Sequence, residues 1–318
     1  MAATGFVTAA GVAVVICWLG IVLGPRFGFV DRPDGSLKPH DRPIAPLGGA
    51  GVFAGLHLGL GAAGVFDPGL FTATLLVWAL GLVDDRFGLG PRVRLAGVGL
   101  AGMTLVAFSD VALFSVMGAF WIFVVLVVVN ATNLFDGLDG LLGSVAATAM
   151  TGLWVLALLQ TEMSAATFLA PIGAVLGFVG WNWPPARIFL GDNGAYVVGV
   201  SLVWLGLNTA PSGFDSLLAT ALIGVPLLDL AVTVVRRLLS GVDLTSGGRD
   251  HFYDRLRGTG MRTAAVTRTM TAAQSVWIAV LVVVSELGSV LAAVTTAGVL
   301  AMLTVVLLAR FPPGAPAS

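Results

Sequence analysis

Charged residues are scarce in this sequence: the 318-residue chain has only 16 lysines and arginines and 17 aspartates and glutamates. Soluble proteins carry roughly 25% charged residues, so a charged fraction of 10% beside 57% hydrophobic residues excludes a soluble globular enzyme. The single lysine, Lys38, and a net charge of −1 leave no polybasic segment for nucleic acid. The single cysteine, Cys17, excludes an intramolecular disulfide and a cysteine-rich metal site. We therefore expect a lipid bilayer to surround most of the protein.

Apolar runs recur along the chain at about the 20-residue length that crosses a bilayer. We predict one all-α, polytopic membrane domain over residues 1–318, with about eleven transmembrane helices. The first run is predicted to be an anchor rather than a signal peptide, because arginines follow it and none precedes it. The expected spans are 2–25, 43–66, 68–83, 95–109, 111–135, 140–161, 163–186, 193–214, 216–235, 269–285 and 287–309.

The lysines and arginines all fall in alternate loops, on one side of these spans. The positive-inside rule predicts an outer N-terminus and a cytoplasmic C-terminus in the inner (plasma) membrane. Any active site is then expected in the cytoplasmic loops or at the helix ends beside them. These loops are 25–46, 84–94, 136–140, 182–192 and 236–268.

Two adjacent acids, Asp84 and Asp85, end the third span. Neighbouring carboxylates at a membrane boundary repel one another and lose hydration, so they usually need a cation or a proton. A solvated helix end balanced by Arg86 explains the pair equally well.

The fifth span runs into a polar stripe that contains Asn130, Asn133, Asp136 and Asp139. Steps of three residues keep Asn130, Asn133 and Asp136 near one side of a helix. Their oxygens suit Mg²⁺, which takes one or two protein ligands and completes its shell with water and phosphates. A helix end followed by an Asp-Gly turn explains Asp139 but not both asparagines.

Asp192 stands just before the eighth apolar run, where an aspartate commonly caps a helix. The same place collects phosphate, with Arg187 available as a charge partner. Both interpretations stay open.

The last inner loop places several arginines beside His251, a pattern that favours phosphate binding. An ordinary positive-inside loop explains the arginines but not His251. Asp229, inside the ninth span, is either a functional acid or a residue that reaches toward Arg236.

Four motifs follow one another along the sequence. They are Asp31-Arg-Pro-Asp with Lys38-Pro-His40 and Pro46-Leu-Gly-Gly, Gly81-Leu-Val-Asp-Asp, Asn130-Ala-Thr-Asn-Leu-Phe-Asp-Gly-Leu-Asp-Gly, and Pro185-Ala-Arg-Ile-Phe-Leu-Gly-Asp. Together they resemble the polyprenyl-phosphate N-acetylhexosamine-1-phosphate transferases of glycosyltransferase family 4, in the bacterial branch that uses UDP-N-acetylglucosamine. The resemblance implies transfer of a sugar-1-phosphate from a UDP-sugar to a polyprenyl phosphate, with release of UMP and initiation of a lipid-linked cell-envelope glycan. It is also compatible with a homodimer.

The resemblance also implies roles for individual residues. Asn133 and Asp192 would hold Mg²⁺, or Mn²⁺ in its place, while the catalytic residues would be Asp84, Asp85, Asp136 and His251. The substrate-binding residues would be Lys38, His40, Asn130, Asp139, Asn182, Arg187, Arg249 and Arg255.

One departure concerns the sugar. The bacterial branch usually has several histidines in the last inner loop, whereas Tyr253 and Asp254 follow His251 here. The identity of the sugar therefore stays open, and a UDP-N-acetylmuramoyl-pentapeptide donor is disfavoured. Two other classes remain as alternatives: an intramembrane Mg²⁺-dependent prenyltransferase and a multi-span transporter.

Overall fold

The computed structural model describes residues 1–31, 42–160, 165–243 and 248–309, and the regular elements in these ranges are all α-helices. Asp31 and Ile44, on either side of the part of the chain between α1 and α2 that is not described, form a β-bridge. The helices are α1 (Ala2–Leu23), α2 (Gly48–Ala62), α3 (Pro68–Phe87), α4 (Pro91–Ala107), α5 (Val116–Phe135), α6 (Leu141–Gln160), α7 (Ala165–Asn182), α8 (Gly191–Thr209), α9 (Gly213–Ala221), α10 (Val225–Ser240), α11 (Phe252–Gly258), α12 (Thr263–Leu287) and α13 (Val290–Ala309).

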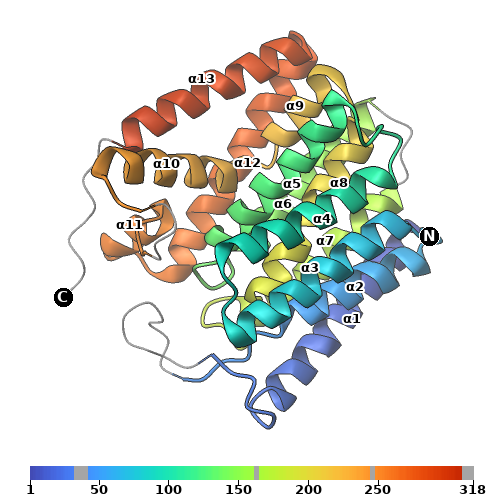
Figure 1. The fold of residues 1–318 in the computed structure, drawn as a ribbon, viewed down its shortest axis with the longest axis vertical. Coiled ribbons are helices and arrows are strands. Elements are labelled where there is room, and N and C mark those ends of the chain that lie inside the picture. Colours follow the sequence, from blue (N-terminus) through green and yellow to red (C-terminus); the bar gives the residue numbers. More distant parts are fainter. Residues whose placement is uncertain (32–41, 161–164, 244–247, 310–318) are drawn as a thin grey trace.

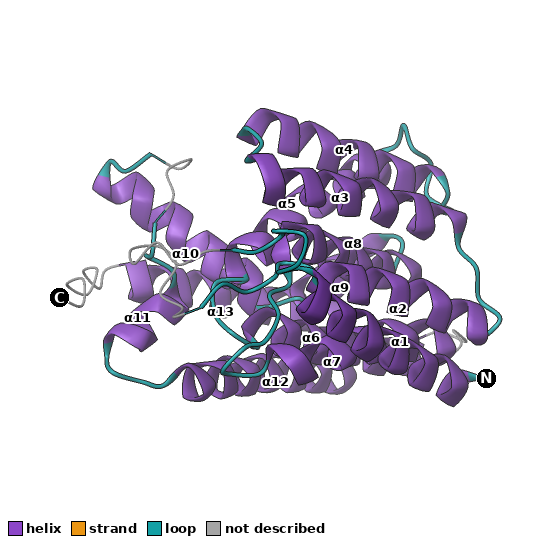
Figure 2. Cartoon of the chain, turned by 90° about the horizontal axis from the view of Figure 1, so that it is seen from below, coloured by secondary structure: helices purple, strands orange, loops and turns teal. Residues whose placement is uncertain are grey.

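Helix α8 forms the centre of the bundle, and almost every residue from Asn193 to Thr209 is buried. A helix that is apolar all round is stable only when other helices surround it. Helices α2, α3, α5 and α6 pack against α8, while α1 and α7 pack on α2 and α4 packs on α3 (Figures 1 and 2). The beginning of α8 is thereby held at the centre of the molecule.

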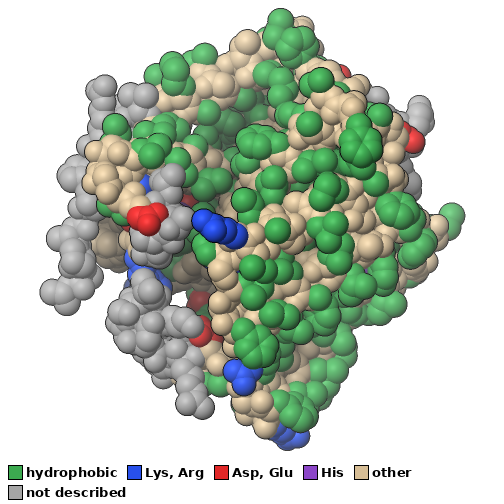
Figure 3. Space-filling view, viewed as in Figure 1, with side chains coloured by type: hydrophobic (Ala, Val, Ile, Leu, Met, Phe, Trp, Pro, Cys, Tyr) green, Lys and Arg blue, Asp and Glu red, His purple; other side chains and the backbone are tan. Residues whose placement is uncertain are grey.

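Within the described ranges, four helices are long and apolar enough to cross a membrane: α1, α5, α12 and the Leu141–Leu159 part of α6. A fifth span results if the bent pair α9 and α10 is counted as one. Each of the eleven segments expected from the sequence contains a helix in the structure. Hydrophobic side chains cover most of the face in Figure 3, and the charged side chains visible there lie mainly toward the side of α10 and α11.

The expected single helix over 216–235 is wrong, because the chain breaks into α9 and α10 at an angle of 81°. Gly224 has a φ of +61°, which a glycine adopts at little cost. Pro226 follows in the first turn of α10, where proline is well accommodated because it has no N–H to satisfy. Helix α10 therefore runs in a different direction from α9, at one side of the bundle, where it packs against α13 and α5 (Figure 1).

Small residues let α1 and α2 approach closely. A Cβ atom added to Gly55 of α2 would lie 2.6 Å from the Ala9 carbonyl oxygen and 3.2 Å from the Ala13 Cβ. A Cβ atom added to Gly61 of the same helix would meet nothing within 4 Å. Where lipid supplies no hydrophobic drive, such close backbone contact is a main source of helix association.

We therefore expect Gly55→Ala to destabilise the protein by about 1–3 kcal/mol through overpacking. Gly61→Ala, the matched control, should be neutral or slightly stabilising because alanine favours a helix over glycine. The single cysteine, Cys17, is buried in the same interface, so a thiol-reactive dye can follow thermal unfolding in detergent. Equal melting temperatures for the two variants would contradict this account of the interface.

Candidate active site

The carboxylate of Asp85, near the end of α3, binds the beginning of α8. Its Oδ1 accepts a hydrogen bond from the Asp192 amide at 2.9 Å, and its Oδ2 accepts from the Asn193 amide at 3.3 Å and from Asn193 Nδ2 at 2.6 Å. These amides are among those that a helix start leaves without partners. Asp85, from another helix, is therefore the cap of α8.

The interpretation of Asp192 as the helix cap is wrong for the same reason. Helix α8 already begins at Gly191, so Asp192 lies inside its first turn, where its amide is a donor that needs an acceptor. The close approach of α3 makes Asp85 available, because Gly81 has no side chain. A Cβ atom at Gly81 would lie 2.3 Å from the Asn193 backbone.

Asn133, near the end of α5, reaches the other side of Asp192. Its Nδ2 donates to Asp192 Oδ1 at 2.6 Å. The Asn133 side chain keeps Oδ1 as a further oxygen donor, and the Asp192 carboxylate also shares a side-chain hydrogen bond with Asp84. Asp136 follows at the end of α5, and burial together with the charges of Asp192, Asp85 and Asp139 raises its pKa well above the ordinary value. The second, third and fourth of the predicted motifs thus meet at one place.

Asp84 is buried beside this cluster and has its own partners. Its Oδ2 accepts from the Tyr196 hydroxyl at 3.0 Å, and its Oδ1 accepts from the Leu89 amide at 2.6 Å. The guanidinium of Arg94, the nearest cation, lies 3.6 Å from Oδ2. Asp84 is therefore fixed by α8 and by the loop that follows α3.

Among the described residues, no group of three or more His, Cys, Asp and Glu side chains is arranged to hold a metal ion. The oxygens of Asn133 and Asp192 nevertheless fit Mg²⁺, which needs only one or two protein ligands when substrate phosphates and water complete its octahedron. The mutual repulsion of Asp85, Asp136 and Asp192 favours a cation at this place.

Asp139 and Asn182 form a second polar cluster that joins loops to one another. Asp139 Oδ2 accepts from the Ala186 amide at 2.9 Å. Asn182 is buried, with Oδ1 accepting from the Gly140 amide at 2.7 Å and Nδ2 donating to the Ile188 carbonyl at 2.8 Å. Both side chains thus hold the loop before α8 against the loop after α5, and their predicted contact with substrate stays a prediction.

His251 stands just before α11, with its imidazole buried. Nδ1 lies 2.6 Å from Asp229 Oδ2, and the ring stacks on Tyr253 at a centroid distance of 5.3 Å. The Tyr253 hydroxyl donates to the Leu134 carbonyl at 2.8 Å. The last inner loop is therefore attached to the end of α5, close to Asp136.

The arginines of this loop pair mainly with its own acids. Asp250 accepts hydrogen bonds from Arg237 at 2.8 and 3.1 Å and also from Arg236. Burial opposes ionisation of Asp250, but the bonds from Arg237 and Arg236 outweigh it and lower its pKa. Arg249 lies 3.6 Å from Asp254. For the remaining predicted arginine, Arg255, burial lowers the pKa, and the charge of Arg236 adds to this effect.

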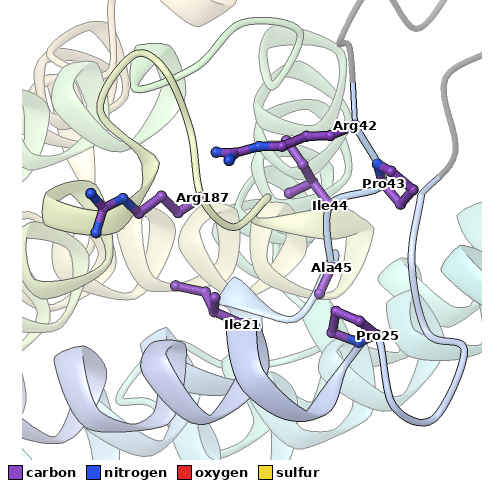
Figure 4. Close-up of a pocket in the computed structure, with 7 residues that line it drawn as sticks. All are labelled: Ile21, Pro25, Arg42, Pro43, Ile44, Ala45 and Arg187. Atoms are coloured by element: carbon purple, nitrogen blue, oxygen red, sulfur yellow. The ribbon is translucent and has the colours of Figure 1, made fainter.

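Four predicted binding residues lie away from this cluster or outside the described residues. The Arg187 guanidinium lies over the Trp181 ring and lines a pocket with Arg42 beside the end of α1 (Figure 4). Lys38 and His40 are outside the described residues. Asn130 is exposed, and its Nδ2 donates to the Leu126 carbonyl of its own helix at 2.7 Å.

Sequence reasoning missed four partners of these residues: Asn193 on Asp85, Tyr196 and Arg94 on Asp84, and Asp250 on the paired arginines. Only one local signal was present. Asn193 and Tyr196 lie three residues apart in the first turns of an otherwise apolar run, a spacing that puts both side chains on one face of α8.

We expect Asn182→Ala to lower the free energy of unfolding by about 1–3 kcal/mol for each buried backbone group left without a partner. Asn130→Ala is the matched control, because it removes one bond within a single helix at an exposed position. Thermal unfolding in detergent measures both changes. A loss for Asn130→Ala as large as that for Asn182→Ala would contradict the loop-joining role.

Comparison with known proteins supports the motifs. Residues 68–210 match the family described as Glycosyl transferase family 4. The chain is 30% identical over 259 residues to the "Probable undecaprenyl-phosphate N-acetylglucosaminyl 1-phosphate transferase" of Bacillus subtilis, covering 74% of this chain and 72% of the relative. It is 31% identical over 223 residues to the "Undecaprenyl-phosphate alpha-N-acetylglucosaminyl 1-phosphate transferase" of Thermotoga maritima, covering 69% of each chain. The Escherichia coli (strain K12) protein of that name is 28% identical over 276 residues, 78% of this chain and 75% of the relative. The chain belongs to glycosyl transferase family 4.

Proposed function

We propose that this protein transfers N-acetylhexosamine-1-phosphate from a UDP-sugar to a polyprenyl phosphate and releases UMP. The observation that carries the proposal is the meeting of Asp85, Asn133 and Asp192 at the start of the central helix. The relatives are named as transferases that act on undecaprenyl phosphate, which agrees with the proposed reaction. Membership in the family argues against both alternatives, the prenyltransferase and the transporter.

The proposed reaction exchanges one phosphorus–oxygen bond for another. An oxygen of the polyprenyl phosphate attacks the sugar-side phosphorus of the UDP-sugar, and the bond between that phosphorus and the oxygen of UMP breaks. The acceptor phosphate is already largely ionised near neutral pH. The reaction therefore needs positioning and neutralisation of negative charge more than it needs a general base.

This requirement bears on the three predicted catalytic aspartates. Both oxygens of Asp85 are engaged in holding α8, so we assign Asp85 the task of orienting the site rather than of removing a proton. Asp84, fixed by Tyr196 and near Arg94, would lie at the boundary where a lipid phosphate arrives. Asp136 would contact the nucleotide part of the donor in its protonated or metal-neutralised form.

Asn133 and Asp192 would hold the divalent ion, Mg²⁺ or Mn²⁺. When bound, such an ion neutralises diphosphate charge and polarises the reacting phosphorus–oxygen bonds. The positive end of the α8 dipole lies in the same place. We also propose that this site faces the cytoplasm, with about eleven spans and the N-terminus outside, and that the product enters cell-envelope glycan synthesis. A homodimer stays a prediction.

Purified protein with undecaprenyl phosphate and UDP-N-acetylglucosamine should form lipid-linked product and UMP. Activity should be lost with EDTA and regained with excess Mg²⁺. We expect Asp192→Asn to lower kcat by on the order of 100-fold or more. The substitution removes the carboxylate charge that would hold the ion, and the ion would neutralise the reacting phosphates. Asp110→Asn changes an exposed acid in a predicted outer turn and should retain the wild-type rate.

Dye-monitored unfolding separates a lost function from a lost fold in both variants. A folded Asp192→Asn protein with a nearly normal rate would remove Asp192 from the proposed metal site. A wild-type protein that releases no UMP from a panel of UDP-sugars would contradict the proposed reaction itself.

The proposed orientation can be tested by cysteine labelling in a Cys17→Ala background. Asp110→Cys should react with a membrane-impermeant maleimide on intact cells, because its turn is predicted to lie outside. Thr259→Cys, also at an exposed position, should react only after the membrane is opened. The reverse pattern would mean that the orientation is inverted.

A further inference from the structure

Asp229 is a buried acid in the middle of the broken span, and both its oxygens bind the last inner loop. Its side chain is only 3% exposed. Oδ2 lies 2.6 Å from His251 Nδ1, and Oδ1 accepts from the Phe252 amide at 2.8 Å. An intramembrane acid is expensive unless it is paired, so this arrangement explains why the carboxylate is tolerated where it lies.

The same face of α10 continues this contact along the loop. Thr233 and Arg236 follow Asp229 by four and seven residues, a spacing that places all three on one side of a helix. Thr233 Oγ1 lies 3.4 Å from His251 Nδ1, and Arg236 with Arg237 binds Asp250. The polar face of α10 therefore fixes the backbone and the ring of the residues just before α11.

The opposite nitrogen of His251 is left for another partner. A carboxylate only accepts hydrogen bonds, so the ring proton lies on Nδ1, toward Asp229. Within the described parts of the chain, Nε2 makes no hydrogen bond. Tyr253 stacks on the ring, and its own ring meets Phe135 edge-on at 5.6 Å. His251 is thus held from both sides next to the segment that carries Asp136.

We propose that Asp229 is a positioning residue, which holds His251 through Nδ1 so that Nε2 meets an anionic phosphate oxygen of the sugar nucleotide. A carboxylate behind an imidazole fixes its tautomer and orientation. The inference rests on the proposed function, since it names the residue that prepares His251 for that donor.

A double-mutant cycle in the transfer assay tests it. Asp229→Asn should lower kcat/KM for UDP-N-acetylglucosamine by roughly 10–100-fold, the range for residues that orient a functional histidine. KM for the polyprenyl phosphate should not change. In a His251→Ala background the same substitution should have no further effect, because Asp229 then has no imidazole to orient. Asp215→Asn, an acid in the other half of the broken span, serves as the matched control.

An equal loss in both backgrounds would overturn the proposal, because it would show that Asp229 acts through the Phe252 amide and the fold alone. A nearly normal kcat/KM for Asp229→Asn would also overturn it. Failure of the proposed function is a different result: the wild-type protein would then turn over no UDP-sugar.

A measurement on the wild-type protein avoids the risk that the variants do not fold. The chain has only three histidines, His40, His57 and His251, so ¹⁵N-histidine spectra are simple to assign by removing His40 and His57. Added UDP-N-acetylglucosamine should shift the Nε2 resonance of His251 while Nδ1 keeps its proton. An unchanged Nε2 resonance at saturating nucleotide would overturn the proposal.

Discussion

The site depends on one contact between helices, in which Asp85 of α3 caps the first turn of α8. Three hydrogen bonds from Asp192 and Asn193 converge on this carboxylate. The contact needs Gly81, since any side chain there would displace the α8 backbone. Because α8 is the buried centre of the bundle, the contact fixes Asp192 relative to every other helix, and Asn133 of α5 then reaches it.

This arrangement concentrates negative charge at buried positions, where a carboxylate loses the hydration that stabilises its charged form. Burial raises the pKa of Asp136, and the negative charges of Asp192 and Asp85 raise it further. The positive end of α8 compensates in part, and Arg94 does so for Asp84. A divalent cation would neutralise the negative charge that remains. The site therefore has its charge balanced only when its ligands are bound.

The helical nature of the fold could be predicted from the sequence, because the length of an apolar run is a local property of the chain. Each expected span contains a helix, and the carboxylate motifs placed at the inner helix ends do meet. The bend before α10 and the cap of α8 could not be predicted in the same way. Asp85 and Asp192 are 107 residues apart in sequence, and a helix cap supplied by another helix leaves no local pattern. The pairing of Asp229 with His251 was hidden for the same reason, since only the fold turns that face of α10 toward the loop.

The altered histidine motif changes what the last inner loop must do. Tyr253 bonds to the Leu134 carbonyl and packs on Phe135, so its side chain attaches the loop instead of offering a second imidazole. Asp254 lies near Arg249, and burial raises its pKa. A loop with several histidines can present more than one nitrogen to a phosphate, but here His251 is alone. The orientation of that single ring then matters more, and a buried carboxylate behind it is the physical means by which one imidazole can be kept in place.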